Sequence, residues 1–243
     1  MKKIAYEEMF ENEMTHPWYL ATRKLMLNLL RKHLSKNSFI LDAGCGTGGT
    51  MKFLKERGYK NLCGIDKSEI AIRYCMKRGL KGIKRGTIQK LPYKDNIFDA
   101  IVCMDVLYHK GVERKRALKE FNRVLKPNGI FYSQEPAYDW LRSKHDKVVE
   151  TNHRFTKEEM TEIAKNEGFK IIKSSYFNSF LLPILVIKRI TEKFMSDSKK
   201  SDVSRLPYLI NYIMLKIFIL ETHVIKSSNL PFGLSIIVVC QKK

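Results

Sequence analysis

Short apolar runs and segments with helical spacing of apolar residues follow one another along most of the chain. The apolar runs, rich in Ile, Val, Leu and Phe, predict buried strands, and the segments between them predict amphipathic helices. Strands are expected at 38–44, 61–66, 81–86, 98–105, 130–136, 170–177 and 234–241. Regular alternation of this kind predicts a doubly wound α/β fold, in which a mostly parallel sheet carries helices on both faces.

Capping residues mark the ends of the predicted helices. Pro17 stands near the start of the first, and Ser68 and Thr156 precede two others as N-caps. Glycines follow several of the helices, and Pro127 is expected to stop the fourth. The helices are predicted at 17–34, 50–58, 68–79, 112–129 and 156–168.

The alternation breaks between residues 178 and 233. This interval is long and apolar, and it contains the charged stretch SDSKKSDVSR. We interpret it as an insertion of two amphipathic helical segments on either side of a mobile link. The predicted organisation is therefore an N-terminal helical cap at 1–34, a core at 35–177 plus 234–243, and a helical insertion at 178–233.

The chain of 243 residues is strongly basic, with 45 Lys and Arg against 25 Asp and Glu and a net charge of +20. Such a charge is compatible with nucleic acid or an anionic membrane as a partner. Lys outnumbers Arg by 32 to 13 and is spread over the whole chain, which favours a solvated surface instead.

Five cysteines stand singly at 45, 63, 75, 103 and 240, without the paired spacing of a zinc site, so we expect no metal. Free buried cysteines indicate a reducing compartment. The first ten residues do not form a signal peptide, and the apolar stretches are shorter than the ~20 residues that span a bilayer. A cytoplasmic protein is expected, with peripheral attachment to the inner membrane face left open.

The stretch ILDAGCGTGG, at 40–49, places four glycines directly after the first predicted strand. Ligands of parallel sheets bind beyond the carboxyl ends of the strands, and glycines there let backbone N–H groups approach a ligand closely. The spacing differs from the dinucleotide fingerprint G-x-G-x-x-G. On its own, the motif indicates either a nucleotide site or only a tight turn.

Two acids narrow the choice of ligand. Asp66 ends the second predicted strand, where a carboxylate can accept both hydroxyls of a ribose. Asp42 lies two residues before the first glycine, and its charge would repel a phosphate there and attract an amino group or a sulfonium. The pattern therefore favours a cationic nucleoside without phosphate.

Four ordered motifs together resemble the class I S-adenosylmethionine-dependent methyltransferases: LDAGCGTG at 41–48, the acid Asp66, the segment 85–109 and the segment 117–132. The resemblance covers about residues 35–178. It implies a Rossmann-like sheet of seven strands with the last one antiparallel, and S-adenosyl-L-methionine as cofactor. The cofactor-binding residues that it implies are Asp42, Gly44, Cys45, Gly46, Gly48, Asp66, Lys67, Thr87, Ile88, Gln89 and Met104.

The segment 136–156 and the final LPFGLSIIVVCQKK are similar to a branch of small bacterial and archaeal methyltransferases, often linked to glycan or lipid-carrier pathways. Two positions depart from the family pattern. Thr87 stands where an acid usually contacts the adenine amino group, so Gln89 is expected to make that contact or the contact is weaker. Glu135 stands where the branch has an apolar residue, which makes the acceptor pocket more polar.

A hydroxyl acceptor needs a base to remove its proton. The candidates are His109, His145, His153 and Glu135, although a hydrogen-bonded structural role is the alternative for His109. Arg142 and Arg154, beside the last two histidines, are expected to form a cationic rim for a phosphate or carboxylate on the acceptor. The alternative for this group is a charged, exposed helix face.

Two segments, the N-terminal helical cap and the insertion, are candidates to cover the site. Tyr6, Trp18 and Arg23 are expected to close over the cofactor, with Arg23 pairing with its carboxylate, unless their helix only packs on the sheet. The apolar helix at 208–220 forms a lid, a homodimer face, or a contact with anionic lipid. The lipid contact would be helped by nearby cations at 188, 189, 193, 199, 200 and 205.

These features predict an enzyme that methylates an oxygen of a small molecule, such as a sugar, a glycan or a lipid-linked intermediate in glycan biosynthesis. An RNA methyltransferase is the second possibility, favoured by the charge alone. The segment MDVLYH lacks the Asn/Asp-Pro-Pro-aromatic motif of base N-methylation, and no RNA-binding module is visible. A catalytically silent, cofactor-binding partner subunit is the third.

Overall fold

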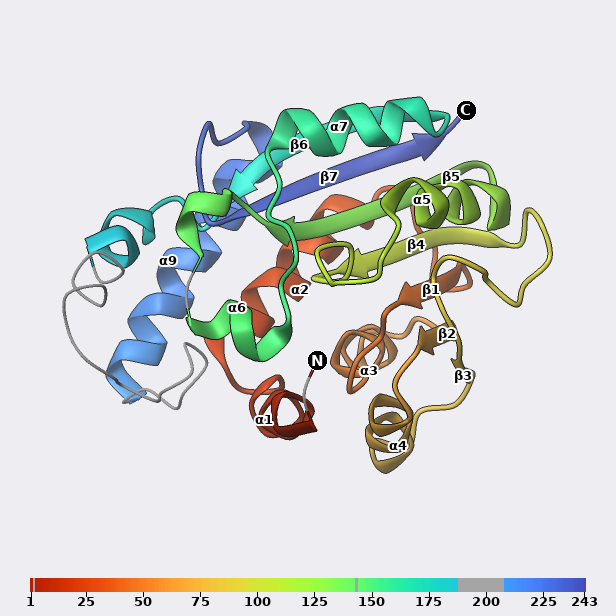
Figure 1. The fold of residues 1–243 in the computed structure, drawn as a ribbon, viewed down its shortest axis with the longest axis horizontal. Coiled ribbons are helices and arrows are strands. Elements are labelled where there is room, and N and C mark those ends of the chain that lie inside the picture. The colour runs from red at the N-terminus through yellow and green to blue at the C-terminus, as the bar shows by residue number, and fades with distance from the viewer. Residues whose placement is uncertain (2, 143, 188–207) are drawn as a thin grey trace.

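A seven-stranded sheet forms the centre of the protein in the computed structural model, which describes residues 1, 3–142, 144–187 and 208–243 (Figure 1). The sheet order is β3-β2-β1-β4-β5-β7-β6. Neighbouring strands are parallel except β7, which is antiparallel to both β5 and β6. The predicted fold class is confirmed. The strands are β1 (Phe39–Ala43), β2 (Asn61–Asp66), β3 (Ile83–Arg85), β4 (Phe98–Met104), β5 (Leu125–Pro136), β6 (Phe169–Phe177) and β7 (Ser235–Lys242).

Alternating side chains of the central strands supply two separate hydrophobic cores. In β4, Ile101 and Cys103 face one core while Ala100 and Val102 face the other. Successive residues of a strand point to opposite faces, so an almost unbroken apolar run is required where both faces are covered. This explains why the central strands read as continuous hydrophobic stretches.

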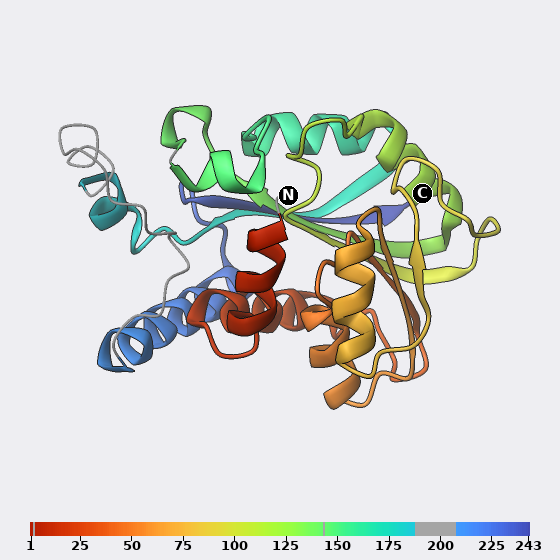
Figure 2. The ribbon, with the colours of Figure 1, turned by 60° about the horizontal axis from the view of Figure 1, so that its bottom comes forward.

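Helices cover both faces of the sheet (Figure 2). One core holds α5 (Arg114–Val124) and α7 (Lys157–Asn166), and the other holds α2 (Pro17–Leu30), α3 (Gly49–Glu56) and α9 (Tyr208–Ser227). A smaller cluster of Cys45, Met51, Cys75 and Leu80 fixes α4 (Glu69–Lys77) beside α3. The layers therefore leave the carboxyl ends of β1, β2 and β4 facing the N-terminal helices.

Three helical elements lie outside the helix ranges predicted from the sequence, although the first of them falls within the predicted N-terminal helical cap. Helix α1 (Lys3–Asn12) lies against α4, with the Phe10 and Tyr74 ring centroids 4.5 Å apart. The 3₁₀ turn η1 (Asp139–Leu141) and the short helix α6 (Lys144–Val149) follow β5. Short helices of this kind have weak periodicity, and tertiary contacts stabilise them more than their own sequence does.

Predicted boundaries hold at some caps and fail at others. Pro17 is the first residue of α2, and the Thr156 hydroxyl accepts the Glu159 N–H at 3.2 Å at the start of α7. Ser68 is the N-cap residue of α4, as predicted, but its hydroxyl makes no capping bond and its N–H donates to Asp66.

The end of α5 also differs from the prediction. The helix stops at Val124, and Leu125 already pairs with Phe98 as the first residue of β5. Pro127 disfavours helical backbone at the residue before it, and the gain of a strand pairing ends the helix earlier still. The strand carries a register shift opposite Phe98 and Ala100, which accommodates the proline.

The insertion places a long helix against the N-terminal cap. Helix α9 packs on α2, and Trp18 lies 5.9 Å from Phe218 and 5.5 Å from Phe177 between ring centroids. A helical turn at 182–187 precedes α9 along the chain, and the link expected between the two falls within 188–207, outside the described residues. Among the helices that the structure describes, none is both long and apolar enough to cross a membrane.

The Thr156 cap provides a test of this fold. Thr156→Ala removes the acceptor for the Glu159 N–H, so the free energy of unfolding is expected to fall by about 1 kcal/mol. Urea unfolding followed by circular dichroism measures this change. Thr161→Ala on the same helix is the control, because that hydroxyl bonds only the Glu158 carbonyl of its own helix. Equal stability of the two variants would contradict the capping role.

Candidate active site

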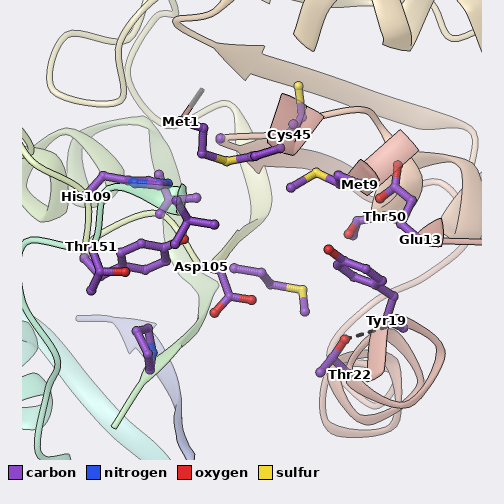
Figure 3. Close-up of a pocket in the computed structure, with 18 of the residues that line it drawn as sticks. Met1, Met9, Glu13, Tyr19, Thr22, Cys45, Thr50, Asp105, His109 and Thr151 are labelled. Carbon is purple, nitrogen blue, oxygen red and sulfur yellow. Dashed lines mark hydrogen bonds between the residues drawn. The ribbon is translucent and has the colours of Figure 1, made fainter. Parts of the chain in front are cut away.

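A cavity of about 380 Å³ lies at the carboxyl ends of β1, β2 and β4, beneath α1 and α2 (Figure 3). Its walls come from segments far apart in the sequence, including the glycine loop, the turn after β4 and the middle of α9. Ligand sites in open α/β sheets occupy this position. Most of the predicted cofactor residues line it: Arg23, Asp42, Gly44, Cys45, Gly46, Asp66, Lys67, Thr87, Ile88, Gln89 and Met104.

The glycine loop is bare because neighbouring segments leave no room for side chains. Gly44 has φ +84°, and a Cβ there would lie 2.4 Å from Cγ2 of Val106 in the turn after β4. The Gly44 and Cys45 N–H groups donate to the Ile65 carbonyl, at 2.8 and 3.0 Å, which ties the loop to β2. Gly48, another predicted cofactor residue, does not line the cavity and instead caps α3 with φ +86°.

Asp66 is held in place by the loop that it faces. Its carboxylate accepts the Gly46 N–H at 3.0 Å and the Ser68 N–H at 2.9 Å. Burial raises the pKa of Asp66, and the two backbone N–H groups act in the opposite direction. The carboxylate is therefore oriented toward the cavity before any ligand arrives.

Asp42 is the least compensated acid of the site. It is 4% exposed, and its Oδ2 atom is buried without a hydrogen-bond partner in the part of the chain that the structure describes. Burial, followed by the charge of Glu13, raises its pKa to about 7, while Arg23 lowers it. A buried carboxylate oxygen without a partner costs free energy unless a ligand satisfies it. The position suits a cationic group.

A buried ionic cluster joins the cap to the glycine loop. Glu13 accepts from Arg23 at 3.0 Å and from Arg78 at 2.8 Å, and the Thr47 hydroxyl also donates to it. Two guanidinium groups share one carboxylate, so the cluster keeps a positive surplus beside the cavity. Arg23 is 2% exposed, and its expected partner, a cofactor carboxylate, would have to share it with Glu13.

The expected adenine contact of Gln89 is not supported, because its side-chain amide is already engaged. Its Nε2 donates to the Gly111 carbonyl at 3.1 Å, and its Oε1 accepts the Glu113 N–H at 2.7 Å. Gln89 thus fixes the 111–113 turn. Ile88 and Met104 are apolar and line the cavity, as expected for walls around an aromatic ring.

Asp105 and Tyr19 are cavity residues that the sequence reasoning missed. Both side chains point into the cavity from different walls (Figure 3). Asp105 directly follows β4 with φ +57°, and burial raises the pKa of its carboxyl to about 7 despite Arg154 and Gln134. Burial, then the charges of Glu13 and Asp105, raises the pKa of Tyr19. The position next to a strand end, the signal used for Asp66, would also have found Asp105.

Two predicted bases occupy different environments. Glu135 is fully buried, does not line the cavity, and accepts the N–H groups of Val106, Leu107 and Tyr108 at 3.0–3.3 Å. It therefore holds the turn after β4, and its expected role as a base is not supported. His109 does line the cavity, but burial and nearby cationic groups lower its pKa to about 4. It is neutral at pH 7 and a weak base.

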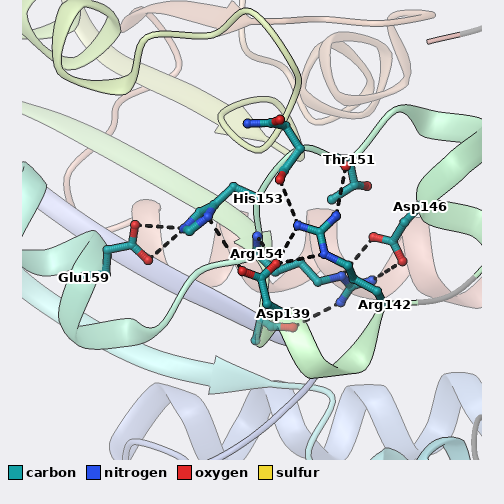
Figure 4. Close-up of polar contacts among 9 residues, drawn as sticks. Asp139, Arg142, Asp146, Thr151, His153, Arg154 and Glu159 are labelled. Carbon is teal, nitrogen blue, oxygen red and sulfur yellow. Dashed lines mark hydrogen bonds and ion pairs between the residues drawn. The ribbon is translucent and has the colours of Figure 1, made fainter.

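The prediction of a cationic rim after β5 is wrong for Arg142, His153 and Arg154, the three of its residues whose side chains the structure describes (Figure 4). Each is neutralised within a local network. The His153 ring is 2.8 Å from Glu159, Arg142 bonds Asp139 at 2.6 Å, and Arg154 makes two bonds to Asp146 at 2.9 and 3.0 Å. Only Arg154 of the three lines the cavity. The side chain of His145 lies outside the described part of the chain.

The end of the cavity beneath α9 is apolar. Trp18, Leu185, Met214 and Phe218 contribute to its wall there. All four belong to the cap or the insertion, so the two added segments build this end together. The cavity thus has a carboxylate-lined end at the glycine loop and a hydrocarbon-lined end under α9.

Comparisons with known proteins agree with this geometry. Residues 41–133 match the family model described as "Methyltransferase domain". An uncharacterized protein of Methanocaldococcus jannaschii is 29% identical over 175 residues, covering 69% of this chain and 64% of the relative. Sterol 24-C-methyltransferase of Schizosaccharomyces pombe is 30% identical over 120 residues, covering 46% of this chain and 30% of the relative. The chain spans less than two thirds of either relative.

A solved structure shows the same fold over nearly the whole chain. Geranyl diphosphate C-methyltransferase from Streptomyces coelicolor, in complex with Mg²⁺, geranyl diphosphate and S-adenosyl-L-homocysteine, superimposes with a TM-score of 0.59 at 14% identity. The match covers 90% of this chain and 78% of that one. Residues 41–133 form a class I S-adenosylmethionine-dependent methyltransferase domain, and the cofactor is S-adenosyl-L-methionine.

The raised pKa of Asp42 leads to a pH-dependent affinity. A cationic cofactor binds the ionised carboxylate better, and with a pKa of about 7 the ionised fraction grows as pH rises from 6 to 8. Affinity for S-adenosylmethionine is expected to rise roughly tenfold over this range. Asp42→Asn should bind more weakly and lose the slope. Calorimetric titration measures both, and an unchanged slope in the variant would refute the assignment.

Proposed function

We propose that this class I methyltransferase transfers a methyl group to an oxygen of a small acceptor that carries a hydrocarbon part, such as a lipid-linked glycan intermediate. The observation that carries the proposal is the lining of the cavity. Asp42 and Asp66 share one cavity with the apolar side chains Met214 and Phe218 of α9, and Asp105 lines the same cavity.

The residues at the polar end fit the cofactor, which supplies a methyl group activated on a sulfonium. The buried oxygen of Asp42 pairs with its positive charge, and the fixed carboxylate of Asp66 accepts the ribose hydroxyls. Ile88 and Met104 enclose its apolar surface. The Glu13–Arg23–Arg78 cluster retains a positive surplus that attracts its carboxylate.

Asp105 is the base in this proposal. A carboxyl with a pKa of about 7 is partly ionised at neutral pH. A general base works best when its pKa lies close to the pH at which the enzyme operates. It accepts the proton of the acceptor hydroxyl as the oxygen attacks. The Tyr19 hydroxyl, pointing into the same space, donates a hydrogen bond to the acceptor and positions it (Figure 3).

Methylation of a carbon atom of an isoprenoid is a second candidate. The sterol 24-C-methyltransferase relative and the geranyl diphosphate C-methyltransferase fold favour it. The apolar end of the cavity would accept such a chain equally well, and Asp105 would then remove the proton that a carbon centre loses after methylation. The atom methylated in the product distinguishes the two candidates.

An acceptor screen tests the proposed function. The protein is incubated with methyl-labelled S-adenosylmethionine and soluble sugars, sugar nucleotides, lipid-linked glycans, free isoprenoids and RNA. Labelled product is expected from lipid-linked glycans, with the label on an oxygen by mass spectrometry and NMR. Label on isoprenoid carbon would support the second candidate, whereas label in RNA alone would overturn both.

Substitution of Asp105 tests the assignment of the base. Asp105→Asn keeps the size of the side chain but cannot accept a proton, so kcat is expected to fall about 10²–10⁴-fold with cofactor affinity retained. The wild-type rate should rise with pH through about 7, the pKa of this carboxyl. Asp95→Asn, at an exposed position, is the control. A variant at 105 with wild-type kcat and pH profile would show that Asp105 is not the base.

A further inference from the structure

Helix α9 exposes a row of large apolar side chains on its outer surface. Leu209, Tyr212, Ile213 and Leu220 are 48–66% exposed, although the opposite side of the helix is buried through Phe218 and Ile225. An apolar helix surface facing solvent is costly and usually meets another apolar surface. The outer surface of α9 therefore needs a partner beyond the described chain.

The preceding segment extends this surface. Phe180, Ile184 and Ile187, in and beside the helical turn at 182–187, are 44–65% exposed. Leu185 of the same turn and Met214 of α9 line the apolar end of the cavity. The N-terminal half of α9 projects beyond the sheet in two views, so it is accessible to an extended surface (Figures 1 and 2).

The charges of α9 point to an anionic partner. Its exposed charged side chains are Lys216 and Lys226, and its one acid, Glu221, is buried and accepts the N–H groups of Asn178 and Phe180 at 2.7 and 2.6 Å. Lys216 lies 5.1 Å from the centre of the Tyr212 ring. Lysine and tyrosine beside an apolar stripe are typical of helices that lie in a lipid interface.

We propose that this outer surface, defined by Phe180, Ile184, Ile187, Leu209, Ile210, Tyr212, Ile213 and Leu220, rests on an anionic lipid bilayer. The helix lies in the plane of the interface, with its apolar row toward the acyl chains and its lysines at the headgroups. The route of the acceptor rests on the proposed function: its hydrocarbon part enters the cavity from the bilayer between Leu185 and Met214.

Vesicle co-sedimentation tests the docking without cofactor or acceptor, so its outcome is independent of the proposed function. Wild-type protein is expected to bind phosphatidylcholine vesicles that contain phosphatidylglycerol, and to bind pure phosphatidylcholine at least about tenfold more weakly. Added salt should weaken binding to the mixed vesicles, because exposed charges are screened.

The double variant Leu209→Glu/Ile213→Glu is expected to lower vesicle affinity by at least about tenfold, since it places two charges against the acyl chains. Met76→Glu on α4, at a side chain that is 64% exposed elsewhere, is the matched control and should bind like wild type. An unchanged affinity for S-adenosylmethionine shows that each variant is folded.

Two results would overturn the docking proposal. One is wild-type protein that remains in the supernatant with both kinds of vesicle. The other is a dimer, measured by light scattering, that the double variant dissociates while vesicle binding is absent. That second result would show that another copy of the chain covers this surface.

Discussion

The structure depends on placing a carboxylate, Asp42, in a buried position where no described protein group satisfies its Oδ2 atom. Charged groups in protein interiors are normally paired, as Glu13 is with Arg23 and Arg78. The glycine loop makes the arrangement possible, because a Cβ at Gly49 would lie 2.1 Å from Glu13 and 2.5 Å from Arg23. The glycine loop, the Glu13 cluster and the Asp42 carboxylate therefore form one packed unit, and its unsatisfied carboxylate oxygen suits a positively charged ligand.

Most of the fold could be predicted from the hydrophobic pattern. The strands β1, β4 and β7 are mostly buried on both faces, so their continuous apolar runs identify them within one or two residues. Helix α1 could not be predicted in this way, since it is stabilised by contacts with α4 rather than by its own periodicity. The early end of α5 was missed for a similar reason, because the pairing of Leu125 with Phe98 competes with the helix.

The site residues also fall into those that local sequence signals predict and those that depend on distant contacts. Asp42 and Asp66 were predicted because they stand next to strand ends and glycines, which are local signals. Glu13 was not, because its partner Arg78 is 65 residues away in sequence. The cationic rim failed because the acids that neutralise it, such as Asp146 and Glu159, are recognisable as partners only in three dimensions. Sequence locates strand-end residues well, whereas pairing between distant side chains requires the fold.

The central claim is that the cavity accepts a positively charged nucleoside and excludes phosphate. Calorimetric titration of one protein sample with S-adenosylmethionine and with NAD⁺ at the same pH tests it most directly. The account predicts saturable binding of S-adenosylmethionine and no detectable binding of the dinucleotide, whose pyrophosphate would meet Asp42 and Asp66. Binding of NAD⁺ with no heat from S-adenosylmethionine would contradict it.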